Sequence, residues 1–90
     1  MNLDEIVFIE NFPKLDLHCV ERDISRVMVN DFIKENYRLK NEIVVIIHGI
    51  GKGILKDEVF KTLKQNKYVD DFKMHYNNVG CTIVKLKFDK

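Results

Sequence analysis

The stretch that decides the fold is IVVIIHGIGKG, residues 43–53. Its first five residues are all β-branched and apolar, and the run is too short for a buried helix, so it predicts a central strand covered on at least one face. The strand ends at His48, and the glycines at positions 49, 51 and 53 then predict a loop. Apolar residues recur at helical spacing over residues 54–66, which predicts a helix that begins directly after the loop.

Upstream of this segment, residues 15–19 (LDLHC) alternate between apolar and polar side chains. They predict a short strand in which Leu15 and Leu17 face inward and Asp16 and His18 share the opposite face. Residues 22–37 carry apolar side chains at helical spacing and predict an amphipathic helix. Because a strand–helix–strand connection is nearly always right-handed and makes its two strands parallel, both strands are expected to end at one edge of the sheet.

Downstream, residues 69–76 and 81–88 each alternate around the turn residues 77–80, which predicts a terminal hairpin and the order βαβαββ. Lys73 and His75 on one strand, and Lys85 and Lys87 on the other, lie opposite the apolar positions. They would form an open basic face that tracks a phosphate backbone, although solvated lysines on an exposed sheet give the same pattern. Residues 6–9 predict either an extra edge strand or a packed N-terminal arm within residues 1–12.

The composition limits the class of protein. Ninety residues suffice for one domain, and 46% hydrophobic with 32% charged residues is typical of a globular one. The longest apolar run is far shorter than the roughly 20 residues that span a bilayer, and residues 1–12 carry three acids, so we expect a cytoplasmic protein without a membrane segment. Two cysteines without CxxC spacing predict reduced thiols. A net charge of +1 neither requires nor forbids a polyanionic partner.

The predicted site lies beyond the ends of the two parallel strands, where ligands of such sheets bind. There the glycine loop and the start of the second helix would offer backbone N–H groups to an anion, and two lysines would add charge; the residues are Gly49, Gly51, Lys52, Gly53 and Lys56. A histidine can transfer a proton at a phosphodiester, and a carboxylate can orient it or hold a metal. Taken singly, Asp16, His18 and His48 each fit a structural role; their convergence favours catalysis. Two histidines and an aspartate bind a divalent metal ion only if the distances suit.

Two motifs together, LDLHC at residues 15–19 and HGIGKG at residues 48–53, resemble the signatures LDLHG and HGxGxG of the Smr (small MutS-related) domain. The similarity covers about residues 13–88, including Gly80-Cys-Thr82 at the entry of the last strand, and resembles the stand-alone form of the family. It implies an α/β (two-layer α+β) sandwich in which a mixed four-stranded sheet carries both helices on one face and leaves the other face for nucleic acid.

The resemblance also implies an endonuclease that nicks DNA or cleaves RNA, with links to DNA repair, recombination or ribosome rescue. By motif position the functional residues are Asp16, His18, His48, Gly49 and Gly51, with Lys56 at the family's basic position. One residue departs from the motif: Cys19 stands where the family has glycine. Two alternatives to an endonuclease stay open. One is a module that binds DNA, RNA or the ribosome without cutting, and the other is a protein whose glycine loop binds a nucleotide or small phosphate metabolite.

Overall fold

The computed structural model describes residues 3, 10–50, 53–75 and 78–88. The element order is βαβαββ, as predicted, and both helices agree with the prediction to within one residue. The candidate edge strand at residues 6–9 lies outside the described residues. The elements are β1 (Lys14–Asp16), α1 (Arg22–Arg38), β2 (Ile43–Ile47), α2 (Ile54–Gln65), β3 (Val69–Met74) and β4 (Cys81–Leu86).

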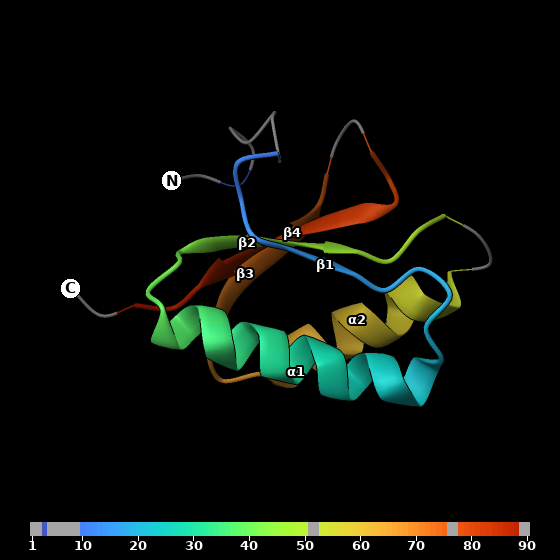
Figure 1. The fold of residues 1–90 in the computed structure, drawn as a ribbon, viewed down its shortest axis with the longest axis horizontal. Helices are drawn as coiled ribbons and strands as arrows, with labels where there is room; N and C mark the ends of the chain where they lie inside the picture. Colours follow the sequence, from blue (N-terminus) through green and yellow to red (C-terminus); the bar gives the residue numbers. More distant parts are fainter. Residues whose placement is uncertain (1–2, 4–9, 51–52, 76–77, 89–90) are drawn as a thin grey trace.

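The four strands form one mixed sheet in the order β1-β2-β4-β3. β1 runs parallel to β2, whereas β2 and β3 both pair antiparallel with β4. The two helices lie side by side on one face of this sheet (Figure 1). The protein is therefore a two-layer α+β sandwich with the predicted mixed sheet.

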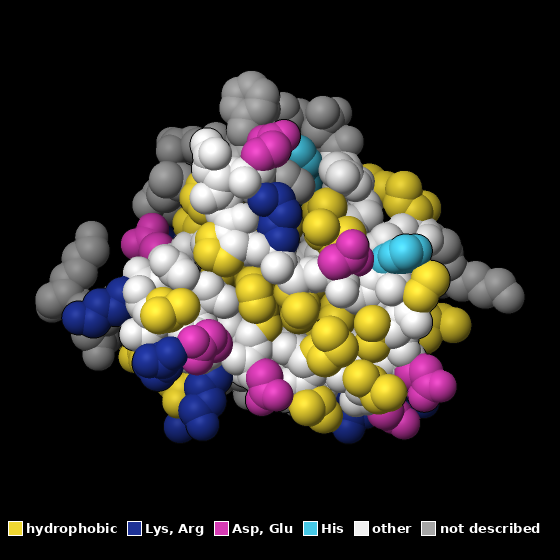
Figure 2. All heavy atoms as spheres, in the orientation of Figure 1, with side chains coloured by type: hydrophobic (Ala, Val, Ile, Leu, Met, Phe, Trp, Pro, Cys, Tyr) yellow, Lys and Arg dark blue, Asp and Glu magenta, His cyan; other side chains and the backbone are white. Residues whose placement is uncertain are grey.

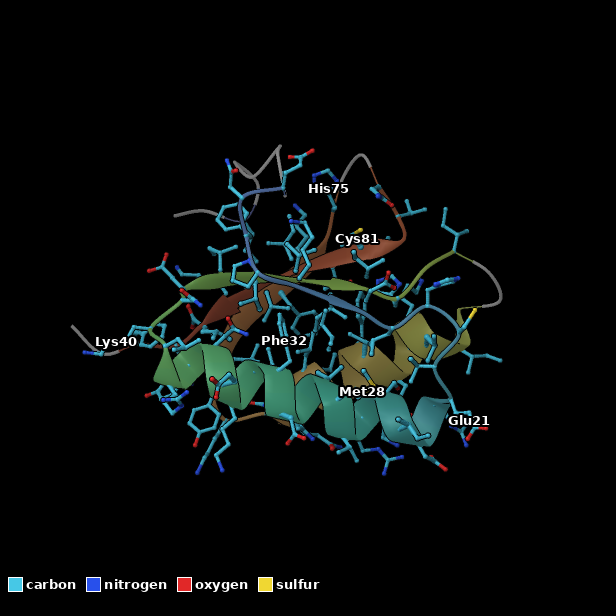
Figure 3. The ribbon with its side chains drawn as sticks, viewed as in Figure 1. Glu21, Met28, Phe32, Lys40, His75 and Cys81 are labelled. Atoms are coloured by element: carbon cyan, nitrogen blue, oxygen red, sulfur yellow. The ribbon has the colours of Figure 1, made fainter. Side chains whose placement is uncertain are left out.

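The main core lies between the sheet and the helices. Alternation along each strand directs every second side chain toward the helices, and residues three or four apart on each helix meet them. The buried members of this core are Leu17, Val44, Ile46, Val84 and Leu86 from the sheet side, and Val29, Ile33, Val59 and Leu63 from the helices. Met28 and Phe32 pack against this core from α1 (Figure 3).

β1 is shorter than predicted, because the chain turns directly after Leu17. The N–H of Val20 donates to the carbonyl of Leu17 at 3.0 Å, and Cys19 has a φ of 67°. A positive φ at the third position of a four-residue turn is what a type II turn requires, and it explains the glycine in the family signature. His18 and Cys19 therefore belong to a turn and not to the strand, so the predicted strand of residues 15–19 was wrong at its end.

Helix α1 ends in a second left-handed residue. Lys40, with a φ of 64°, follows the last turn, and its N–H donates to the carbonyl of Tyr37 at 3.0 Å. The N–H of Asn41 donates to the carbonyl of Asn36 at 2.9 Å, which completes a Schellman motif. Glycine is the usual residue at this position, so Lys40 and Cys19 both adopt a backbone conformation that disfavours a side chain.

Replacing Cys19 or Lys40 with glycine is expected to raise the free energy of unfolding by up to about 1 kcal/mol. The left-handed conformation costs an L-residue roughly 1–2 kcal/mol, and the greater freedom of glycine in the unfolded chain offsets about half of that. Urea unfolding would measure the change. Lys64→Gly within α2 is the control and should lower stability by about 1 kcal/mol. A loss of stability in all three variants would contradict this account.

The helix-free face of the sheet is not the open basic surface predicted from the lysine pattern. Ile43 and Ile83 lie on this face and are 4% and 2% exposed, because Leu3 and Phe12 pack against them. The N-terminal segment thus covers part of the face with apolar contacts that strand alternation does not reveal.

The hairpin also differs from the prediction, because β3 and β4 each end two residues before the predicted ends at residues 76 and 88, and because one histidine is placed differently. His75 is buried, and its Nδ1 accepts the N–H of Asn78 at 3.0 Å, so it does not belong to an exposed basic row. Lys73 and Lys85 do lie on the helix-free face, in register with Ile83 and Ile43.

Candidate functional site

The two parallel strands end side by side. The N–H of Leu17 donates to the carbonyl of Ile47 at 2.7 Å, which extends the β1–β2 pairing by one residue beyond β1. The chain then turns toward α1 on one side and enters the glycine loop on the other. The predicted edge of the sheet is therefore found, with residues 16–18 and 48–53 at its two neighbouring strand ends.

Asp16 and His18 are both exposed at this edge. Asp16 pairs in register with Ile47, which pairs with Cys81, so its side chain lies on the helix-free face. Its Oδ1 accepts the backbone N–H of His18 at 3.0 Å and so stabilises the turn. Burial raises the pKa of the Cys81 thiol, and the negative charge of Asp16 raises it further, so this thiol stays protonated near neutral pH.

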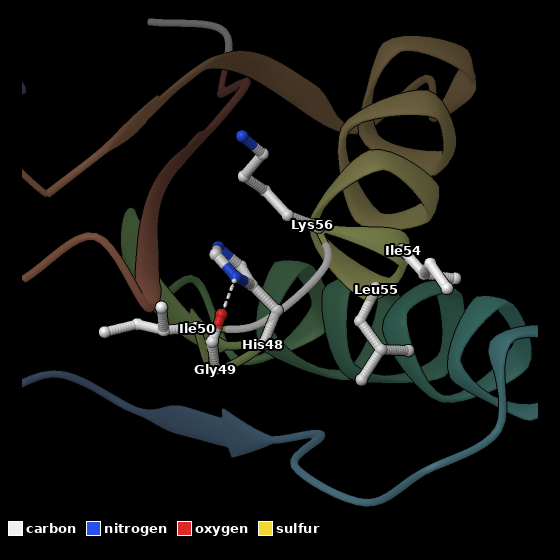
Figure 4. A pocket seen from close by; sticks show the side chains of 7 residues that line it. His48, Gly49, Ile50, Ile54, Leu55 and Lys56 are labelled. Carbon is white, nitrogen blue, oxygen red and sulfur yellow. Dashed lines mark hydrogen bonds between the residues drawn. The ribbon is translucent and has the colours of Figure 1, made fainter.

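His48 has a different environment, because it follows Ile47 and points to the helix side of the sheet. It is only 4% exposed and packs edge-on against Phe60. Its Nδ1 lies 3.0 Å from the carbonyl oxygen of Gly49, which can only accept, so Nδ1 carries the proton (Figure 4). Its Nε2 then accepts the hydroxyl of Thr82 at 2.8 Å. Both ring nitrogens of His48 are thus engaged within the protein.

The three side chains expected to converge are therefore only partly together. Asp16 and His18 share the exposed turn, where the carboxylate of Asp16 accepts the backbone N–H of His18, whereas His48 lies in the helix-covered layer. The reason is alternation: the backbone N–H of His48 still bonds to Gly80 as strand residues do, at 3.0 Å, so its side chain takes the face opposite to Ile47 and Asp16.

The environment of His48 keeps its imidazole neutral. Burial lowers the pKa below its ordinary value of 6.5, and the nearby charge of Lys56 lowers it further, while the hydrogen bond to Gly49 acts in the opposite direction. A neutral ring with the proton on Nδ1 is the form that both hydrogen bonds require. The electrostatics and the geometry therefore agree.

Stability is expected to fall as the pH drops below about 6.5 because of His48. Its folded pKa is depressed, so the unfolded chain binds the proton more readily, and the stabilisation present above 6.5 is lost as the pH falls through the folded value. Urea midpoints from pH 7.5 to 5 would measure this slope. His48→Gln should reduce this slope. Equal slopes in wild type and His48→Gln would contradict the assignment.

A hollow of about 270 Å³ lies beside His48 at the start of α2 (Figure 4). Its lining comes from the glycine loop and the first turn of α2: His48, Gly49, Ile50, Gly53, Ile54, Leu55 and Lys56. Gly49 and Gly53 have φ values of 81° and 80°, which favour glycine. Gly51 and Lys52, also predicted to bind phosphate, lie outside the described residues.

The start of α2 is suited to an anion. Gly53 is its N-cap and, having no side chain, makes no capping hydrogen bond to this end of the helix. The first N–H groups of a helix have no partner within the helix and carry partial positive charge. Lys56, one turn into α2, adds a full charge at the wall of the hollow. The hollow can therefore accept a phosphate group.

Two residues that hold the loop in place were not assigned a role from the sequence. The carbonyl of Gly80 accepts the N–H groups of both His48 and Gly49 at 3.0 Å, and a Cβ at Gly80 would lie 3.3 Å from the carbonyl carbon of Gly49. Thr82 fixes the imidazole of His48. Both contacts depend on the pairing of β2 with β4, which hydrophobic periodicity does not specify.

The three hairpin lysines predicted to bind nucleic acid lie away from this edge. Lys85 is opposite Ile43 at the other end of β2, and its Nζ lies 3.8 Å from a carboxylate oxygen of Asp70. Lys73 is exposed on β3, and Lys87 is exposed just beyond β4. None of them lines the hollow beside His48.

Two further properties concern the described part of the chain. Within residues 3, 10–50, 53–75 and 78–88, no three His, Cys, Asp or Glu side chains are grouped so that they could hold a metal ion. Neither α1 nor α2 has the length and apolar character needed to cross a bilayer.

The fold and the site define a small α+β domain with a glycine loop that opens a helix at the end of two parallel strands. Residues 15–87 match the model of the Smr domain. The chain therefore belongs to the Smr domain family, as its two motifs indicated.

Relatives and solved structures agree with this assignment. The chain is 32% identical over 77 residues to endonuclease MutS2 of Streptococcus suis and 35% identical to that of Caldanaerobacter subterraneus. In both cases the match covers 82% of this chain and 10% of the relative. The fold matches the Smr domain of Thermus thermophilus MutS2 with a TM-score of 0.81, 23% identity and coverage of 84% of this chain and 99% of that one. It also matches YdaL, a stand-alone small MutS-related protein from Escherichia coli, with a TM-score of 0.77, 24% identity and coverage of 88% and 70%.

Proposed function

We propose that this domain is a nucleic-acid endonuclease that hydrolyses a phosphodiester bond, by nicking DNA or by cleaving RNA, in the cytoplasm. The observation that carries the proposal is that one exposed turn, in which the Asp16 carboxylate accepts the backbone N–H of His18, carries a carboxylate and an imidazole beside the start of α2 at the neighbouring strand end. The similarity to MutS2 proteins named as endonucleases supports it.

In this proposal the scissile phosphate sits at the hollow. The N–H groups at the start of α2 and the ammonium of Lys56 stabilise the negative charge that grows on the phosphate oxygens in the transition state. Gly49 and Gly53 leave the backbone of the loop accessible to those oxygens, because neither carries a side chain. Binding and electrostatic stabilisation thus come from the loop and α2.

Proton transfer is assigned to the turn after β1. Hydrolysis requires that a base take the proton of the attacking water and that an acid protonate the leaving oxygen. His18 is the exposed imidazole at this edge and Asp16 the exposed carboxylate, so we assign proton transfer to His18 and the orientation of the turn and the water to Asp16.

His48, which the sequence also suggested for proton transfer, would first have to break one of its two internal hydrogen bonds. We therefore assign it a positioning role, in which it links the carbonyl of Gly49 to Thr82 and holds the loop against the sheet.

Among the described residues at this edge, Asp16 is an exposed carboxylate that could bind a divalent metal ion. Mg²⁺ is commonly bound by one or two carboxylates together with substrate phosphates, so the ion would have to arrive with the nucleic acid. Its chemistry would be to neutralise charge on the phosphate.

A module that binds nucleic acid or the ribosome without cutting it is the second candidate. The internal hydrogen bonds of His48 favour it, because they remove one of the two imidazoles from the reacting atoms. Salt-sensitive binding without any product would identify this case.

The test is to incubate the purified protein with end-labelled RNA and with supercoiled plasmid, each with and without chelator. The proposal expects cleaved or nicked product from at least one polymer. Binding to both without product, over protein concentrations well above the binding midpoint, would replace the endonuclease with the binding module.

A further inference from the structure

A cluster of three aromatic rings lies at the end of the domain opposite to the glycine loop. Tyr37, on the last turns of α1, has its ring centroid 4.3 Å from that of Tyr68 and 4.9 Å from that of Phe88. Tyr37 and Phe88 are stacked, with an angle of 3° between their planes. All three side chains are only partly buried, so the cluster reaches the surface.

One lysine side chain contacts this cluster, and two further lysines are bonded to its residues through their backbones. The Nζ of Lys67 lies over the ring of Tyr68, 5.2 Å from its centroid. The N–H of Lys87 donates to the carbonyl of Tyr68 at 2.7 Å, and that of Lys40 donates to the carbonyl of Tyr37. We call these three lysines and the three aromatic residues the far-end patch. Lysine and arginine side chains gather at the end of the molecule where Lys40 lies (Figures 2 and 3).

Acidic side chains at this end are in part already paired. Glu35 forms an ion pair with Arg38 at 2.6 Å, and Asp70 lies 3.8 Å from Lys85. Glu42 and Asp71 are further acids there. Lys40, Lys67 and Lys87 are all exposed, so the far-end patch combines positive charge with partly exposed aromatic rings.

Aromatic rings interleaved with lysines are suited to single-stranded nucleic acid. Unpaired bases stack on aromatic side chains, and lysines follow the phosphates, whereas in a duplex the base faces are already stacked. An acidic protein partner would form ion pairs with the lysines but would not stack on the aromatic rings. The two features together select a strand with unpaired bases.

We propose that the far-end patch is a second contact for single-stranded nucleic acid. The 17 residues of α1, at a rise of 1.5 Å each, separate it from the turn after β1 by roughly 25 Å. A strand held at the glycine loop would extend to the patch, which adds affinity and selects unpaired substrate. This inference rests on the proposed nucleic-acid function, but its test does not require cleavage.

The test measures the binding of a labelled 20-nucleotide 2′-O-methyl oligouridylate by fluorescence anisotropy at several salt concentrations. Lys67→Gln with Lys87→Gln is expected to weaken binding about tenfold and to reduce the salt slope by about 1.4, since each lysine contact to a single strand contributes about 0.7. The matched control, Lys61→Gln with Lys64→Gln, removes two exposed lysines from α2 and should change neither quantity.

The role of base stacking is tested by changing the oligonucleotide and not the protein, so that misfolding of a protein variant cannot affect the result. An oligonucleotide of the same length whose central nucleotides are abasic should bind wild-type protein at least about fivefold more weakly, since stacking of each base contributes at this level. Equal affinity for the two oligonucleotides would overturn the role of the rings. An equal loss of affinity in the Lys67/Lys87 variant and in the Lys61/Lys64 control would overturn the role of the far-end patch.

Failure of this inference can be separated from failure of the proposed function. If Lys56→Gln weakens binding and the far-end variant does not, the glycine loop binds nucleic acid and the far-end patch does not. If wild-type protein binds no oligonucleotide, this inference fails, and the proposed function is then decided by the cleavage of RNA and the nicking of plasmid. Where cleavage is observed, the far-end variant should raise KM and leave kcat within about twofold.

Discussion

Asp16→Asn is expected to lower the rate of nucleic-acid cleavage by about 100-fold or more. Asp16 is assigned to orient the attacking water for proton transfer to His18; this transfer contributes about 10²–10⁴-fold, and an uncharged amide, which can also donate to the water, orients it poorly. Asparagine retains an oxygen that can accept the N–H of His18, so the turn should persist and the free energy of unfolding should change by less than about 0.5 kcal/mol. Single-turnover cleavage with excess protein would measure the effect on the chemical step.

Asp31→Asn is the matched control, since it neutralises another exposed carboxylate, on α1. It should leave the cleavage rate within about twofold of wild type. If Asp16→Asn cleaves as fast as this control, the carboxylate at the end of β1 has no part in the chemistry.

Thr82→Val is expected to lower the free energy of unfolding by about 1–3 kcal/mol. Valine has nearly the same shape as threonine but cannot donate to Nε2 of His48, and a buried acceptor without a donor costs this amount. Urea unfolding gives the energy, and NMR of the imidazole nitrogens shows whether the proton leaves Nδ1.

The control for this substitution is Thr62→Val in α2, where another buried hydroxyl donates to the carbonyl of Glu58 at 2.8 Å. That carbonyl lies within α2 and can accept a helix N–H, so the cost should stay below about 1 kcal/mol. Equal stability losses in the two variants, with the imidazole unchanged in both, would show that Thr82 does not hold His48.

The elements set by local pattern were predictable from the sequence. The β-branched run of β2 and the apolar stripes of the two helices each follow a single periodicity, and the right-handed crossover then makes β1 and β2 parallel. The edge at which the site lies follows from these features alone.

The parts that depend on contacts distant in the sequence were not predictable in this way. The burial of His48 requires Thr82 on β4, and the cover over Ile43 requires Leu3 and Phe12. Alternation predicts the face that Asp16 takes on β1, but the chain turns after Leu17 and not after Cys19. The separation of Asp16 from His48 follows from the faces that these two residues take once the strands pair.

Cys19, which replaces the glycine of the family motif, affects the conformation of the backbone in the turn. The residue keeps the positive φ that the motif glycine would adopt, with a φ of 67°, so the turn that carries His18 forms with a side chain present. The side chain of Cys19 is exposed. The strain therefore lies in the backbone of Cys19, and the hydrogen bond from the N–H of His18 to Asp16 is kept.

The central claim is that nucleic acid is held at the start of α2, beside the turn of Asp16 and His18. The most direct measurement is a titration of ¹⁵N-labelled Asp16→Asn protein with a single-stranded oligonucleotide, followed by the amide resonances. We expect the N–H signals of Gly49, Gly53, Leu55 and Lys56 to shift in a saturable manner, whatever other segments respond. Saturable binding that leaves all four signals unchanged would contradict the claim.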